Sequence, residues 1–205
     1  VCSQRSKFIS VQDWQEAWAA SRQLVEALRD HTKLAWLSNS LAWDVLDEYV
    51  FQCQAYFNFR HRALAQRLPH AGDLIDIFST GTVVSDLERL TIAWAGDSPG
   101  SKVKNAADLA KPATIGYFAA LQNMRLQCML GSHNGALAVA AGLATEVRRT
   151  VGNFLPHCKV HFCYYAGVSA LMLGKVPQAA SLFRDGLVAA TKDVGRGSPQ
   201  DWDRA

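Results

Sequence analysis

The stretch LPHCKVHFC, residues 155–163, contains four side chains that could bind a metal ion: His157, Cys158, His161 and Cys163. Zinc is commonly bound by two thiolates and two imidazoles, and a thiolate beside an imidazole is also the pair that a thiol-dependent enzyme uses. On a helix, however, Cys163 points away from the other three, and no Cys-x-x-Cys pair is present. We therefore expect buried thiols at a helix start, with no metal and no cofactor. A thiol-dependent enzyme stays open as an alternative.

Asp44, Asp47 and Glu48 are close enough in sequence to suggest a pair of catalytic carboxylates. Such a pair needs a cleft and two environments that drive the pKa values apart. These residues instead fall in the first turns of a predicted helix, where carboxylates interact favourably with the helix dipole. We expect them to cap the helix or to form a salt bridge with a neighbouring subunit. Phosphate-loop, Rossmann and hydrolase motifs are absent, so the sequence predicts a protein that is not an enzyme.

The segment YFNFRHR, residues 56–62, mixes aromatic rings with Arg60, His61 and Arg62. This composition is typical of a surface on which RNA bases stack. At helical spacing the aromatic residues could equally belong to the core, with the arginines near the free carbonyls of a helix end. Both interpretations stay open, and the sequence leaves direct RNA contact undecided.

The composition sets limits on the class of protein. Hydrophobic residues make up 49% of the 205 residues, which predicts a sizeable core, and the net charge of +3 is too small to indicate nucleic acid or acidic lipid by itself. Five scattered cysteines fit reduced thiols in a cytoplasmic protein. No apolar run reaches the length of a membrane span. Because the sequence starts without methionine, we expect a segment of a longer protein.

Helical periodicity dominates residues 1–94, the predicted amino-terminal helical region. A first helix over 11–30, capped by Ser10 or Asp13, should place five apolar side chains on or near one face: Trp14, Trp18, Leu24, Val25 and Leu28. A second helix should begin near residue 40 and run past residue 60. A third is expected over 73–90, weakened by Gly81, and the strand-like TGTVV at 80–84 lies inside it.

A polar linker or loop is expected over 95–111, because this stretch is rich in Gly, Pro, Ser and Lys. Residues 112–192 should then form four helices in two pairs. The first pair is predicted at 113–130 and 134–149, and the second at 158–173 and 176–192. A polar tail is expected over 193–205.

The two pairs are copies of one pattern. Met129-Leu130-Gly131 returns as Met172-Leu173-Gly174, and Ala136 returns as Ala179. Gly131 and Gly174 should end the first helix of each pair in the left-handed conformation, and Pro177 fits the first turn of the helix that follows. Each copy is thus a helical hairpin, and two stacked hairpins predict an all-α fold, an α-solenoid with tetratricopeptide-like repeats.

Three stretches resemble, in the same order, blocks of the family of eukaryotic translation initiation factor 3 subunit L. They are LAWDVLDEYVFQCQAYFNFR (41–60), IGYFAALQNMRLQCMLGSHNGALAV (115–139) and LPHCKVHFCYYAGVSALMLGKVPQAASLF (155–183). The resemblance covers roughly residues 40–66 and 112–192. The loop at 95–111 and Gly81 depart from the family pattern.

This resemblance implies a scaffold of the proteasome–signalosome–initiation-factor type, with the winged-helix end absent from this segment. It implies assembly on the small ribosomal subunit in the cytoplasm, with subunit K of initiation factor 3 as the first neighbour and the E and C subunits of that factor as others. A helical-repeat scaffold of the proteasome lid or signalosome and a free peptide-binding repeat module remain alternatives. The residues expected to have structural or interaction roles are Trp14, Trp18, Trp43, Asp47, Glu48, Gly131, Tyr164, Tyr165, Gly167 and Gly174; for the first two, a place in the core is equally open.

Overall fold

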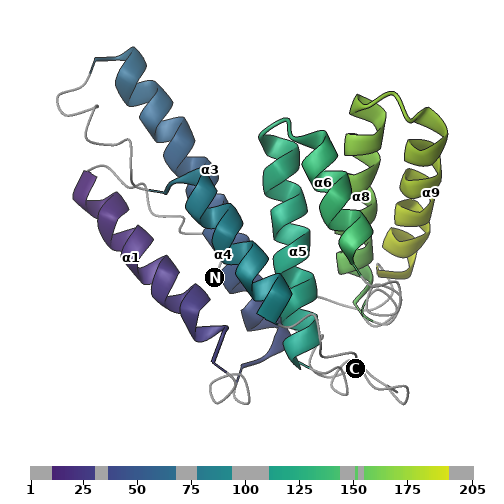
Figure 1. Cartoon of the computed structure of the whole chain (residues 1–205), viewed down its shortest axis with the longest axis horizontal. Helices are drawn as coiled ribbons and strands as arrows, with labels where there is room; N and C mark the ends of the chain where they lie inside the picture. Colours follow the sequence, from purple (N-terminus) through teal and green to yellow (C-terminus); the bar gives the residue numbers. More distant parts are fainter. Residues whose placement is uncertain are drawn as a thin grey trace.

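The computed structural model describes residues 11–30, 37–67, 78–93, 111–143, 151 and 155–193, and the regular elements in these ranges are helices. They follow one another through the molecule in an order close to that of the sequence (Figure 1). None of the helices in these ranges combines the length and the hydropathy that a membrane span requires. The helices are α1 (Val11–Ala27), α3 (Asn39–Ala65), α4 (Thr80–Ala93), α5 (Lys111–Met129), α6 (His133–Gly142), α8 (Pro156–Met172) and α9 (Val176–Asp193).

The all-α prediction is confirmed, and five of the predicted helices lie within a few residues of their expected bounds. The strand-like TGTVV belongs to α4. Helix α6 ends at Gly142, earlier than the predicted residue 149. Four predictions fall wholly or mainly outside the described residues: the cap at Ser10, the start of the third helix at 73, the linker at 95–111 and the tail at 193–205.

Helix α1 is anchored by aromatic rings. The Trp14 ring lies 5.5 Å from Tyr56 and 5.9 Å from Phe78, edge to face in both pairs, and Trp18 stacks on Tyr49 at 5.8 Å. Because such ring pairs add to the free energy of burial, α1 is held firmly against α3.

The predicted apolar face of α1 is right for Val25 and Leu28, which are buried, and wrong for Leu24, which is 54% exposed. Successive residues of a helix are about 100° apart. Leu24 therefore turns away from the core that its neighbour Val25 enters.

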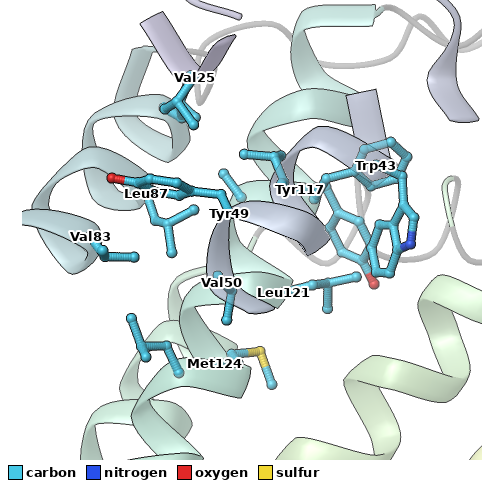
Figure 2. Close-up of a cluster of buried hydrophobic side chains, with 14 of the residues drawn as sticks. Val25, Trp43, Tyr49, Val50, Val83, Leu87, Tyr117, Leu121 and Met124 are labelled. Atoms are coloured by element: carbon cyan, nitrogen blue, oxygen red, sulfur yellow. The ribbon is translucent and has the colours of Figure 1, made fainter. Parts of the chain in front are cut away.

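A shared core joins the first helices to the repeats. Tyr49 and Val50 of α3, Leu87 of α4 and Leu121 and Met124 of α5 are almost completely buried and lie in one cluster (Figure 2). Helix α5 consequently packs against α3 and α4 as well as against its own hairpin partner α6.

Both hairpin turns have the same geometry. Gly131 and Gly174 each have φ of +73°, which confirms the predicted left-handed conformation. The Ser132 N–H donates to the Gln127 carbonyl at 2.8 Å, and the Lys175 N–H donates to the Ala170 carbonyl at 2.8 Å. These bonds satisfy the last free carbonyls of α5 and α8 in the same way.

Small residues allow the helices of each hairpin to approach closely. Ala136 and Ala179 are buried one turn into the second helix of each hairpin, as the repeat predicts. A Cβ atom on Gly167 would lie 2.6 Å from the Phe183 ring, so any other residue at that crossing of α8 and α9 would displace the ring. Helix α8 also packs against both α5 and α6, so the second hairpin stacks on the first. The chain is therefore an α-solenoid of helical hairpins.

Candidate functional site

The first turns of α8 lie against α3 in a buried junction. The Trp43 ring meets the rings of His157 and His161 edge to face, at 5.4 and 5.0 Å. Cys158 Sγ lies 2.9 Å from His157 Nε2. Burial, together with the nearby His161, lowers the pKa of His157 to about 3, and burial also lowers the pKa of His161. Burial therefore disfavours the charged form of both imidazoles.

Cys163 lies on another side of α8, where its Cβ would be 3.0 Å from a Cβ added to Gly186 of α9. Cys158 and Cys163 are both buried, so the buried thiols expected at the start of this helix are confirmed. In the described ranges, no three His, Cys, Asp or Glu side chains are placed so that they could hold one metal ion.

Asp47 forms an ion pair across two helices. Arg125 Nη1 of α5 lies 2.6 Å from Asp47 Oδ1, and Gln122 Nε2 donates to the same oxygen at 3.3 Å. The sequence suggested a helix cap or a salt bridge to a neighbouring subunit. Asp47 is not the cap, and the partner that the structure gives it lies within the chain, 78 residues away. The polar residues Gln122, Asn123 and Arg125, in a stretch of α5 whose other side chains are mostly buried and apolar, are the signal that could have indicated this pair.

The cap of α3 is a serine. Ser38 Oγ accepts a hydrogen bond from the Leu41 N–H at 3.1 Å. Asp44 and Glu48 are exposed on the next turns, and the Gln52 side-chain amide donates to Glu48. The pKa of Asp44 is raised by partial burial and by the charge of Asp47. Neither carboxylate caps the helix.

A second buried polar group links α1, α3 and α4. Tyr49 Oη donates to Asp86 Oδ2 at 2.8 Å, and Arg22 Nε lies 3.4 Å from the same oxygen. Burial and the hydrogen bond to Asp86 raise the pKa of Tyr49 well above its usual range. Sequence reasoning missed this group because its members lie in three separate helices.

The aromatic side chains of YFNFRHR belong to the core. Tyr56 is completely buried, and Phe57 and Phe59 pack against the core cluster. The guanidinium of Arg60 lies over the Phe57 ring at 5.6 Å, while Arg62 is exposed. The basic side chains of this segment are at the surface, but its aromatic side chains do not form a platform for stacked bases.

The last hairpin carries a set of exposed apolar side chains. Its members project from α8 and α9 and are 48–69% exposed: Tyr164, Leu171, Met172, Val176 and Leu187. In the first hairpin, Leu121 occupies the position that Tyr164 occupies in the second, and it is 1% exposed because it lies in the shared core (Figure 2). We call this set of five residues the terminal face.

The other residues that the sequence predicts to have structural or interaction roles fall into buried and exposed groups. Trp14, Trp43 and Gly167 are buried, and Trp18 and Tyr165 are partly buried against the core. The sequence left open whether Trp14 belongs to the core or to an interaction surface. Its burial places it in the core. Gly131 and Gly174 close the hairpins. Tyr164 and Glu48 are the predicted residues with exposed side chains.

Comparison with known proteins finds relatives that all have the same name. Proteins named eukaryotic translation initiation factor 3 subunit L are 26% identical over 176 residues in Monosiga brevicollis, 24% over 158 in Mycosarcoma maydis and 21% over 160 in Homo sapiens. These alignments cover 78%, 71% and 72% of this chain and 34%, 24% and 28% of the relatives. The resemblance noted from the three sequence blocks is therefore confirmed.

The chain spans about a third or less of the length of these relatives. No solved structure matches it. The family described as RNA polymerase I-associated factor PAF67 matches residues 13–201, which is nearly the whole chain. With stacked helical hairpins and relatives of one name over more than two thirds of its length, the chain belongs to this family.

Proposed function

We propose that this chain acts as a non-enzymatic structural subunit of the translation initiation factor 3 complex, in the cytoplasm. The observation that carries the proposal is the similarity to subunit L of that factor in three eukaryotes over 71–78% of the chain. In this role the chain supports assembly of the initiation complex on the small ribosomal subunit by docking its helical repeats to partner subunits.

The terminal face is the proposed docking surface. Inside the chain, one hairpin already stacks on the next, so the contact that this fold makes is helix pair against helix pair. An exposed apolar face at the end of such a stack is suited to a further helix pair. We propose that a helical repeat of subunit K covers it, with the E and C subunits of the same factor as the alternatives.

A structural role also fits the chemistry of the described residues. The Asp47 carboxylate pairs with Arg125 and holds α3 and α5 together, and partial burial lowers the pKa of both imidazoles beside Trp43. If Cys158 or Cys163 were a catalytic thiol, iodoacetamide would alkylate it rapidly in the folded chain. We expect mass spectrometry to find alkylation of both only after unfolding, and rapid alkylation of either thiol would favour the thiol-dependent enzyme.

The domain organisation of the chain is also a proposal. We propose a helical region over 1–94, a linker over 95–111, two hairpin repeats over 112–192 and a polar tail over 193–205. Helix α5 connects the hairpin repeats to the amino-terminal helical region, because it packs against α3 and α4 as well as against α6.

Affinity purification with crosslinking mass spectrometry tests the function. We expect the tagged chain to recover initiation factor 3 subunits and small-subunit ribosomal RNA, with crosslinks from the Lys175 region to subunit K. Recovery of proteasome-lid or signalosome subunits would place the chain in another complex. Recovery of RNA polymerase I subunits without initiation factor 3 would contradict the proposal.

Matched variants test the docking surface. Val176→Glu with Leu187→Glu introduces charge on the terminal face, where both side chains are more than half exposed. Ile92→Glu, at a residue of α4 that is 74% exposed, is the control. We expect the first variant to lose partner subunits while keeping the helicity of the wild type, and the control to retain them. Equal recovery by both variants would exclude the terminal face as the docking surface.

A further inference from the structure

The carboxyl-terminal end of α3 is a basic tip. Helix α3 extends past the helices beside it, at the upper left of Figure 1. The last two turns of α3 contain Arg60, His61 and Arg62. Arg67 follows two residues after the end of the helix. No Asp or Glu occurs in the sequence between Glu48 and Asp73. The tip consequently gathers positive charge on a part of the chain that has no carboxylates of its own.

The arginines of the described residues divide into those with and those without a carboxylate partner, and Arg89 and Arg184 belong with the three arginines of the tip to the second group. Arg22, Arg29 and Arg125 each form an ion pair with a carboxylate. In the part of the chain that the structure describes, no carboxylate pairs with Arg60, Arg62 or Arg67. The Arg60 guanidinium lies over the Phe57 ring, and Arg62 Nε donates to the Asn58 carbonyl at 3.2 Å.

Arg67 has a backbone conformation that disfavours its side chain. Its φ is +51°, in the left-handed region where Gly131 and Gly174 close α5 and α8. Phe78 also has a positive φ, but its ring is 1% exposed and packs against Trp14 and Trp18, so burial offsets the strain. Arg67 is exposed and has no such compensation. The Arg67 N–H donates to the Leu64 carbonyl at 3.1 Å, so the left-handed conformation closes α3, and an exposed arginine stands where glycine would be free of strain.

We propose that this tip binds the phosphodiester backbone of RNA. Guanidinium groups match phosphate oxygens in geometry and remain charged at every physiological pH. Since Tyr56, Phe57 and Phe59 are packed in or against the core, no bases stack on them, and the contact is independent of base sequence. This inference does not depend on docking through the terminal face.

Fluorescence anisotropy of the full chain with labelled single-stranded oligouridylate tests the proposal. The tip variant combines Arg60→Gln, Arg62→Gln and Arg67→Gly. The control combines Arg89→Gln, Lys175→Gln and Arg184→Gln, three exposed cations on other helices or turns, so both variants lose the same charge. We expect the tip variant to lose at least about tenfold in affinity, and its log–log salt slope to fall by about 2, at roughly 0.7 per phosphate contact. The control should stay close to the wild type.

Arg67→Gly alone separates a binding role from a structural one. Glycine relieves the left-handed strain, so we expect a higher Tm together with weaker RNA binding. A residue that serves only the helix end cannot give both changes. Three results would overturn the proposal: no binding of RNA by the wild type at low salt, equal affinity of the tip and control variants, or equally tight binding of a polyglutamate peptide, which would indicate an acidic protein partner.

Discussion

The Asp47 carboxylate is partly buried where α3 meets α5, and it depends on Arg125 and Gln122 for its hydrogen bonds. The side chains of the ion pair are 31% and 15% exposed, so water compensates only partly when one partner is removed. One pair of charges thereby adds to the apolar contact between two helices far apart in sequence.

Replacing Arg125 by Met should lower the free energy of unfolding by about 2 kcal/mol, because a carboxylate loses its charged donor in a poorly solvated site. Urea denaturation followed by circular dichroism measures the change. Adding Asp47→Asn should restore part of the stability. Arg29→Met, which breaks an exposed pair with Glu26, is the control and should cost less than about 1 kcal/mol. A loss as small as in this control would show that the Asp47 pair does not stabilise the fold.

His157 should make the fold sensitive to acid. Burial lowers its folded-state pKa to about 3, while an unfolded histidine has a pKa of about 6.5. Below about pH 6.5 the unfolded state therefore binds a proton that the folded state does not, and stability is lost progressively down to about pH 3. The urea midpoint at pH 5 should lie below that at pH 7. The decrease should be smaller in His157→Phe and unchanged in His61→Phe, whose ring is exposed.

At the scale of the elements, the hairpin turns rest on two glycines whose Cβ positions face open space. The cost of a side chain there is consequently a backbone cost alone. Gly174→Val should destabilise the chain by about 1–2 kcal/mol through left-handed strain. Thermal unfolding measures it, and Gly142→Ala, at a position with equally open space and no positive φ, should cost nothing or slightly stabilise. An unchanged Tm for Gly174→Val would contradict this account of the turn.

The sequence predicts these turns because their signals are local. A glycine, a following helix start and an alanine one turn later recur at the same spacing, so Gly131, Ala136, Gly174 and Ala179 all lie where expected. Helix pairing is different. The bonds of Asp47 to Arg125 and of Tyr49 to Asp86 join residues 78 and 37 positions apart, and no local pattern specifies such a partner.

The function of an apolar face is equally hidden from the sequence. A stripe of tryptophans at helical spacing is compatible with a core and with an interface, and only the packing of α1 on α3 decides that Trp14 is buried. Tyr164 and Leu121 occupy equivalent positions in the two repeats, yet one is exposed and the other buried. Burial at these positions depends on which helices lie next to each hairpin.

For the whole molecule, the terminal face implies association. Several large apolar side chains that are about half exposed or more on one hairpin exceed what a monomer usually leaves in water. We expect analytical ultracentrifugation at micromolar concentration to show self-association or aggregation of the wild type. Val176→Glu with Leu187→Glu should reduce it, whereas Ile92→Glu should not. A monodisperse wild-type monomer that unfolds cooperatively would contradict this expectation.

The Trp43 junction has a consequence for the order of folding. Each hairpin turn joins neighbours in sequence and can form early, but the contact of Trp43 with His157 closes a loop of more than about a hundred residues, and long loops slow folding. We expect the second hairpin to acquire its helices before it docks on α3. A Trp43→Phe variant should then retain the fast phase of helix formation and alter the slower phase, in which the solenoid and the amino-terminal helices become one cooperative unit.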